Sequence, residues 1–218
     1  METLELGRAN FNTYDVETKL RWDGDRAGSI SLEELVEIAR RLALPKAIYK
    51  ASSIKVIGER AVEVAGVTFE SPVLRNCLRR AESAFSYIVT IGPGLESEAG
   101  TSSDLLRQYG LEELANMALY QAAGRLADRI ERRTGLSPLC NISPGSLEDW
   151  PITEQAKLFS IFGDTEQLIG VRLTESMLMI PRKSISGILF PSDEGFVACR
   201  LCTRVACPSR KADPQSSA

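Results

Sequence analysis

The spacing of apolar positions along this chain alternates between helical and strand-like periods. Apolar residues recur every three or four positions over 10–20, 31–44 and 104–133, which is the pattern of amphipathic helices. Segment 104–133 has the clearest stripe, and its small alanines permit close packing. The stripe consists of Leu111, Leu114, Ala115, Ala118, Ala122, Leu126 and Ile130. We expect a long helix there that covers a sheet.

Strand-like segments lie between the helices. Residues 54–69 alternate around two glycines, which predicts short strands in a hairpin, and the apolar run 84–92 predicts a buried strand. Further strands are predicted over 171–180, 184–190 and 195–202, with a hairpin turn at 191–195. Shorter helices are predicted over 71–82 and from Thr153 to about Phe162, a loop over 92–103 and a turn-rich segment over 137–151.

Interleaved helices and hairpins predict an α+β fold. We expect one domain over residues 1–207, with a twisted, mostly antiparallel sheet flanked by helices. Its N-terminal part, about residues 1–50, is expected to be helical, and residues 208–218 are expected to be a disordered tail.

Composition narrows the classes of protein that this chain can belong to. Apolar residues make up 44% and charged residues 25% of its 218 residues, as in ordinary globular proteins. A net charge of −3 argues against a nucleic-acid binder. No apolar run is long enough to cross a bilayer, and the acidic N-terminus does not look like a signal peptide, so we expect a cytoplasmic protein without a membrane partner.

The chain has no histidine. This excludes histidine-based acid–base catalysis, Ser-His and Cys-His nucleophile pairs, and every zinc site that contains histidine. We accordingly assign no catalytic residue.

Two loops imitate ligand sites. Residues 23–34, DGDRAGSISLEE, place Asp23, Asp25, Gly28 and Glu34 as in an EF-hand, but Ala27 stands where an oxygen ligand is expected. A turn followed by a helix with Ser31 as its N-cap accounts for the same sequence without a bound ion. The loop at 90–98, TIGPGLESE, lacks the third glycine or the lysine of a phosphate cradle, so a tight turn is favoured.

Cysteines near the C-terminal end have the spacing of a metal site. Cys199 and Cys202 could bind one ion, Cys207 could add a third thiolate, and Cys140 is the natural fourth ligand. Four thiolates would suit zinc or an iron–sulfur cluster. The alternative is that Cys199 belongs to a strand core and the other two to a flexible tail. Cys77 is expected to be part of the core.

Several short motifs in order over residues 143–190 resemble one known family. They are Ser143-Pro144-Gly145, Glu154-Gln155-x-Lys157, Leu173-Thr174-Glu175-Ser176, Met179-x-Pro181 and Ser184-Ile185-Ser186-Gly187. Together they resemble the activation domain of cobalamin-dependent methionine synthase. Upstream, LRWDGDR, LPKAIY and VTIGPGLE resemble stand-alone, single-domain relatives of that group.

The resemblance implies a task as well as the fold. It implies an accessory protein that binds S-adenosylmethionine and caps a corrinoid (cobalamin-binding) protein or methyltransferase subunit on a separate chain. There it would support the reductive methylation of oxidised cobalt. Catalysis by this chain alone is not expected, since its part would be to hold the methyl donor in place.

The cofactor-binding positions that the resemblance implies are Asn141, Ser143, Gly145, Ser146, Asp128 and Phe196. Asn141 and Ser146 stand where the family has an arginine and a tyrosine, and asparagine cannot supply the positive charge of arginine. The acidic position of the family's long helix aligns with Gly124, and Asp128 lies one turn further on.

Two other functions remain open at this point. The cysteines could form an iron–sulfur or zinc site that passes electrons to a corrinoid partner. Alternatively, the chain could be a relative that kept the fold as a scaffold and lost ligand binding.

Overall fold

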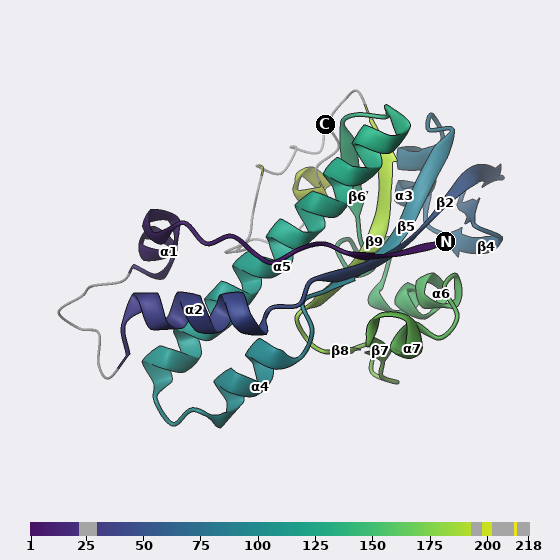
Figure 1. Ribbon diagram of the computed structural model, residues 1–218. Coiled ribbons are helices and arrows are strands. Elements are labelled where there is room, and N and C mark those ends of the chain that lie inside the picture. Colours follow the sequence, from purple (N-terminus) through teal and green to yellow (C-terminus); the bar gives the residue numbers. More distant parts are fainter. Residues whose placement is uncertain (22–29, 193–197, 202–211, 213–218) are drawn as a thin grey trace.

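The computed structural model describes residues 1–21, 30–192, 198–201 and 212, and Figure 1 shows their arrangement. In chain order the elements are β1 (Glu2–Glu5), α1 (Thr13–Leu20), α2 (Leu32–Leu42), β2 (Lys46–Ile57), β3 (Ala61–Val64), β4 (Val67–Glu70), α3 (Pro72–Leu78), β5 (Ser83–Thr90), α4 (Gly94–Thr101), α5 (Leu105–Thr134), β6 (Leu139–Ile142), the 3-10 helix η2 (Ile152–Glu154), α6 (Gln155–Ser160), α7 (Thr165–Ile169), β7 (Arg172–Leu173), β8 (Met179–Ile180), β9 (Ser184–Pro191) and the 3-10 helix η3 (Ala198–Leu201).

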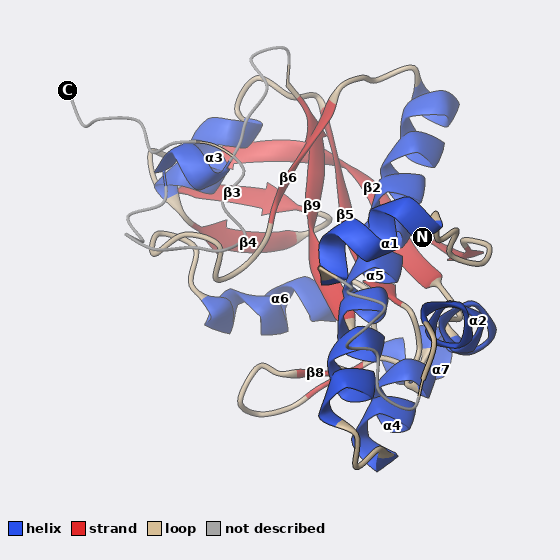
Figure 2. Ribbon diagram, turned by 90° about the vertical axis from the view of Figure 1, so that its left-hand side faces the viewer, coloured by secondary structure: helices blue, strands red, loops and turns tan. Residues whose placement is uncertain are grey.

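The main sheet has the strand order β4-β3-β2-β5-β9-β6, and β1 also pairs with β2. Every pairing among the described strands is antiparallel, so the predicted fold class is confirmed. The long strand β2 pairs with β1 and β5 along its first part and with β3 along its last part. The sheet therefore curls at β2, as Figure 2 shows.

Helix α5 covers one face of the sheet. Asp104 caps its N-terminus by accepting hydrogen bonds from two backbone N–H groups, and Gly135 ends it in a left-handed conformation. Its apolar stripe packs on the side chains of β5 and β9 that point to this face, among them Tyr87 and Leu189. Figure 1 shows α5 running diagonally across the sheet. The predicted long helix is confirmed.

A second apolar cluster fills the opposite face of the sheet. Trp150 is its largest fully buried side chain and meets Phe69 edge-on, with ring centroids 5.8 Å apart. Helices α3 and α6 contribute Leu74 and Leu158 to the same cluster. The sheet is thus buried on both faces, which explains the continuous apolar run of β5.

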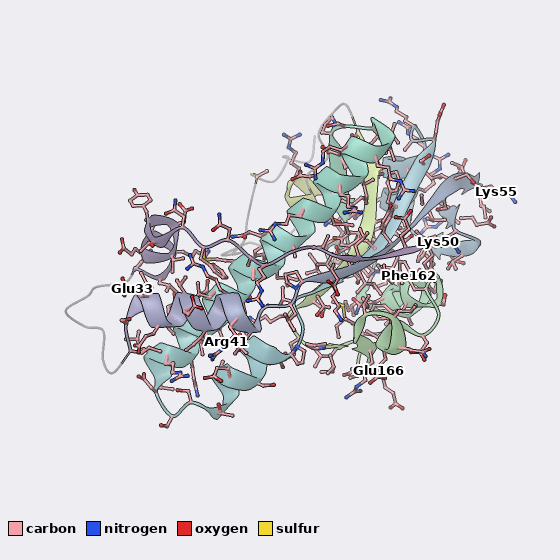
Figure 3. All side chains as sticks on the ribbon, in the orientation of Figure 1. Glu33, Arg41, Lys50, Lys55, Phe162 and Glu166 are labelled. Carbon is pink, nitrogen blue, oxygen red and sulfur yellow. The ribbon has the colours of Figure 1, made fainter. Side chains whose placement is uncertain are left out.

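Helix α2 begins with a capping box. Ser31 Oγ accepts a hydrogen bond from the backbone N–H of Glu34, and the Glu34 carboxylate accepts one from the N–H of Ser31. Glu33 and Arg41, both labelled in Figure 3, are exposed on this helix. The first ligands of the EF-hand-like loop, Asp23 and Asp25, lie outside the described residues.

Three predictions about local structure are wrong. The loop expected over 92–103 contains helix α4, because Gly94 lies close against Leu42 of α2 and the helix buries Leu95 and Ala99. The strand expected over 195–202 is overturned at 198–201, which form the 3-10 helix η3. The strand expected over 171–180 is two short strands, β7 and β8, joined by a turn in which Met177 has a positive φ.

Two strands, β1 and β6, and the first part of β2 were not predicted from the sequence. The N-terminal part, expected to be helical, contains β1, and β2 begins at Lys46, eight residues before the predicted hairpin. Strand β6 lies inside the segment that was expected to be turn-rich. In the part of the chain that the structure describes, no helix is both long and apolar enough to cross a bilayer.

Side chains of α5 fasten the N-terminal segment to the domain. Arg125 Nη1 donates hydrogen bonds to the carbonyl oxygens of Leu6, Gly7 and Arg8, at 3.1, 3.1 and 2.7 Å. Gln121 bonds both the N–H and the carbonyl of Asn10. One helix therefore holds this segment through its backbone, which the sequence of the segment does not reveal.

Replacing Arg125 with alanine should lower the free energy of unfolding by about 1–2 kcal/mol, because three carbonyls lose a charged donor at a partly exposed site. Urea unfolding measures the loss. The matched control is Arg129→Ala on the exposed side of the same helix, which should stay within about 0.5 kcal/mol of the parent. Equal effects of the two changes would contradict the assignment.

Candidate functional site

A row of polar groups crosses three strands on the α5 face of the sheet. Tyr87 of β5 lies opposite Gly187 of β9. Asn141 of β6 lies opposite Leu189, which is two residues after Gly187 and therefore on the same face of β9. The Tyr87 hydroxyl donates a hydrogen bond to Asn141 Oδ1 at 2.9 Å. Since Tyr87 is buried and Asn141 is exposed, the row runs from the core to the surface at the edge strand β6.

Gly187 makes this close approach possible. A Cβ atom at Gly187 would lie 2.6 Å from the carbonyl oxygen of Ile142, 2.8 Å from Ser143 Oγ and 2.9 Å from Asn141 Oδ1. Real side chains essentially never approach so closely, and one of the three atoms belongs to the backbone. The space above Gly187 is therefore occupied by the polar groups of β6 and of the residue that follows it.

Burial keeps the Tyr87 hydroxyl protonated. It raises the pKa of Tyr87 well above its usual value, and a hydrogen bond with Ser143 offsets this only in part. The hydroxyl therefore serves as a donor to Asn141. Asn141 Nδ2 in turn lies 3.4 Å from Ser143 Oγ, a long and weak hydrogen bond.

The segment after β6 is a tight turn. The backbone N–H of Ser146 donates to the carbonyl of Ser143 at 3.1 Å, and the Ser146 hydroxyl donates to the same oxygen at 2.6 Å. Gly145 has a φ of +78°, a conformation that side chains rarely adopt, and its N–H donates to the carbonyl of Trp150. Ile152 packs against Gly145, where a Cβ would lie 3.1 Å from it.

Asp149 anchors the far end of this turn to helix α3. Its Oδ2 accepts hydrogen bonds from the Ser71 hydroxyl at 2.6 Å and from the backbone N–H of Val73 at 2.7 Å. The next residue, Trp150, is fully buried. The backbone that carries Gly145 is thus fixed by a polar anchor and an apolar one, which suits a preformed binding surface.

Helix α5 forms the other side of the site. Glu131 Oε1 accepts a hydrogen bond from the backbone N–H of Leu139, so this side of α5 faces β6. Gly124 and Asp128 precede Glu131 by seven and three residues and lie on the same stripe of the helix. Both are exposed, and nothing lies within 4 Å of a Cβ placed on Gly124.

We call this arrangement the β6–α5 site, comprising Asn141, Ser143, Gly145 and Ser146 with Gly124 and Asp128 of α5. It offers an exposed amide on β6 and an exposed carboxylate on α5, with open space at Gly124. It contains no histidine and no thiol. Such a site can bind and orient a polar ligand, but it offers no evident proton shuttle or nucleophile.

Of the six positions that the sequence singled out for a cofactor, Asn141, Ser143, Gly145 and Ser146 lie together at the end of β6 and in the turn after it, and Asp128 lies exposed on α5, three residues before Glu131. Phe196 lies outside the described residues. Tyr87 and Gly187 were not assigned to the site from sequence. Tyr87 sits in an unbroken apolar run and gives no signal, whereas Gly187 ends a motif that was already noted.

The four proposed metal ligands are not shown to converge. Cys140 is buried in the cluster on the opposite face of the sheet from Asn141. The backbone of Cys199 lies in η3, and Cys202 and Cys207 fall outside the described residues. Within the described part of the chain, no group of three or more metal-binding side chains occurs. The metal site therefore stays a prediction, open to metal analysis of anaerobically purified protein.

A pocket of about 300 Å³ lies elsewhere, between α2 and the start of α5. Its lining residues are Ile30, Glu34, Glu37, Ile38, Arg41 and Arg107. Glu34 is engaged in the capping box, and Arg107 forms an ion pair with Glu98. Because Arg107 and Asp128 are 21 residues apart on one helix, the pocket is about 30 Å from the β6–α5 site along the helix axis.

Replacing Gly187 with alanine should destabilise the protein by about 1–3 kcal/mol and displace Asn141, because the new methyl group overlaps backbone as well as side-chain atoms. Urea unfolding measures the first effect. Gly124→Ala is the matched control, and there we expect a gain of about 0.5–1 kcal/mol because the helix has room for a methyl group. A neutral Gly187→Ala would contradict the described packing.

Cys77 should resist alkylation. Burial, and secondarily the nearby Cys140, raise the pKa of the Cys77 thiol from 9.0 to about 12. At pH 8 the folded protein should react with iodoacetamide at Cys77 more than about tenfold more slowly than the urea-unfolded chain, by peptide mass spectrometry.

The sign of the pH effect on stability follows from the same shift. Since the folded state keeps the Cys77 thiol protonated, its contribution to stability is complete below pH 9 and is lost as the pH rises toward 12. A Cys77 that reacts equally fast in the folded and unfolded chain would refute this description of its surroundings.

Comparison with known proteins shows what part of this sequence and its fold are similar to. Residues 145–197 match the family model described as vitamin B12 dependent methionine synthase, activation domain. The fold matches a solved structure, described as the MetH reactivation domain bound to AdoHcy (S-adenosylhomocysteine), with a TM-score of 0.57 and 14% sequence identity. The match covers 90% of this chain and 80% of that chain. No curated protein matches significantly. Residues 145–197 are therefore similar to the activation domain of vitamin B12-dependent methionine synthase, as their motifs predicted, and the chain shares the fold of the reactivation domain.

Proposed function

We propose that this chain binds S-adenosylmethionine, or its demethylated product S-adenosylhomocysteine, at the β6–α5 site. In this role it supports the reductive reactivation of a corrinoid methyltransferase carried on a separate chain. The observation that carries the proposal is the family match over residues 145–197, which begins within this site and includes Gly187. The structural neighbour was solved with S-adenosylhomocysteine bound, which agrees with this ligand class.

The described residues fit such a ligand in their chemistry. S-adenosylmethionine carries a sulfonium, an ammonium and a carboxylate. The exposed carboxylate of Asp128 suits one of the cations, and the N–H group of Asn141 suits an acceptor oxygen. The open space at Gly124 leaves room for a bulky group beside the helix.

The chain would contribute orientation more than chemistry. Methyl transfer breaks the bond between the methyl carbon and sulfur, and the electron pair stays on sulfur as a neutral thioether. A corrinoid partner, reduced by one electron from an external donor, would supply the group that accepts the methyl. This chain would hold the sulfonium still and shield it from water, and proximity of this kind can supply much of a rate enhancement.

The partner would have to reach the exposed side of the turn at 143–146. Gly145 and Ile152 are exposed there, while Trp150, whose carbonyl accepts the N–H of Gly145, is fully buried. The exposed Ile152 side chain beside a hydrogen-bonded turn suits a protein surface that docks without rearrangement. We infer that a corrinoid-carrying subunit covers this surface when the methyl group is transferred.

Isothermal titration calorimetry with S-adenosylhomocysteine tests the binding step directly. The parent protein should bind it. Asp128→Asn should bind S-adenosylmethionine more weakly by about three- to tenfold, because a carboxylate that faces a cation is neutralised.

A variant of the distant pocket provides the control. Glu37→Gln, on α2, keeps the same change of charge but should leave the affinity unchanged. Absence of heat with both ligands, confirmed by equilibrium dialysis, would contradict the proposal and favour a scaffold that has lost ligand binding.

A further inference from the structure

The Asn141 side chain has a donor end and an acceptor end, and its surroundings decide which end faces outward. The acceptor end, Oδ1, receives the hydrogen bond of the Tyr87 hydroxyl at 2.9 Å. Because the Tyr87 hydroxyl comes from the core and Asn141 lies at the surface, this bond turns Oδ1 inward. The NH₂ group of Asn141 must then lie toward the edge of the sheet.

The donor end is only weakly engaged within the protein. Asn141 Nδ2 carries two N–H groups, and its hydrogen bond to Ser143 Oγ is 3.4 Å long. Within the described residues, the second N–H has no hydrogen-bond partner. Asn141 is exposed, so the site presents an uncharged N–H donor. The hydrogen bond from the buried Tyr87 sets the direction of this donor.

Gly187 leaves the space that the Asn141 side chain occupies. Asn141 Oδ1 sits 2.9 Å from the position of a Cβ on Gly187, and Ser143 Oγ sits 2.8 Å from it. The amide therefore occupies the space that the glycine leaves, with its Oδ1 bonded to the Tyr87 hydroxyl and its Nδ2 to Ser143 Oγ. Hydrogen bonds with Tyr87 and Ser143 hold this amide over the space at Gly187.

We propose that Tyr87 is a positioning residue for the β6–α5 site. By holding Oδ1, it points the uncharged N–H of Asn141 at an acceptor oxygen of the bound ligand. This inference rests on the proposed function, since it assumes that a ligand binds there. It adds that recognition at this point uses a neutral donor, fixed by a buried tyrosine that never touches the ligand.

A double-mutant cycle with S-adenosylhomocysteine, read by calorimetry, tests the coupling. Tyr87→Phe should weaken binding about three- to tenfold, because the amide is free to rotate once its anchor is lost. Asn141→Ala should weaken binding to a similar or larger extent. In the Asn141→Ala background, Tyr87→Phe should have no further effect, whereas a merely structural role would give additive losses.

The sign of the Asn141→Asp effect tests the orientation. Aspartate would keep the bond from Tyr87 but turn a charged acceptor toward the ligand's acceptor. It should therefore bind S-adenosylhomocysteine more weakly than Asn141→Ala does. This comparison stands even if Tyr87→Phe fails to fold.

Tyr49 supplies a matched control. It is the direct neighbour of Tyr87 on β2 and is also buried, but its hydroxyl donates to Glu2, away from the site. Tyr49→Phe removes the same atom from the same core and should leave the affinity unchanged.

The outcomes separate the two claims. No binding by the parent protein would overturn the proposed function, and this inference with it. Binding by the parent, with additive losses in the cycle or with Asn141→Asp equal to the parent, would overturn the positioning role alone. Coupled losses together with a weaker Asn141→Asp would establish it.

Discussion

The absence of a side chain at Gly187 is the constraint on which the site depends. Without it, Asn141 and Ser143 could not lie over β9, and Tyr87 could not reach Asn141 from β5. Edge strands usually expose unpaired backbone and tolerate distortion. Here the edge strand β6 packs closely on β9, because polar atoms of Asn141, Ile142 and Ser143 occupy the place of the missing Cβ of Gly187.

The rest of the fold supplies a rigid frame for this contact. Arg182 and Lys183, just before β9, form ion pairs with Glu96 of α4 and Glu112 of α5. The turn after β6 is fixed at Asp149, through hydrogen bonds to the start of α3. Helix α5 also accepts the backbone N–H of Leu139, at the start of β6, through Glu131. The site therefore lies between fixed segments and not on a free loop. A protein that positions a reactive ligand without acting on its protons needs this rigidity more than it needs titratable groups.

The sequence predicted the parts of the fold that a long periodic pattern specifies. Helix α5 and strands β5 and β9 were found because burial on a sheet imposes regular spacing. Strand β6 was not, because four residues between prolines carry no period and its pairing with β9 is a tertiary contact. Helix α4 was taken for a loop because its glycines and serines are turn formers, whereas packing against α2 decides its conformation.

The site was only partly predictable, for a related reason. The turn Ser143–Ser146 was recognisable as a motif, since Gly145 needs its positive φ. The role of Tyr87 could not be predicted. A tyrosine within an apolar run is expected to be part of the core, and the sequence does not show what its hydroxyl contacts. Which end of Asn141 faces outward follows only from three strands in register, and sequence alone does not give that register.

The central claim is that the ligand lies between β6 and α5, and chemical-shift mapping tests it most directly. Nitrogen-15-labelled protein titrated with S-adenosylhomocysteine should show shifts concentrated at the backbone amides of Gly124, Asp128 and Gly145 and at the side-chain NH₂ of Asn141. Shifts confined to the pocket around Glu37 and Arg107, or no shifts at saturating ligand, would contradict the account.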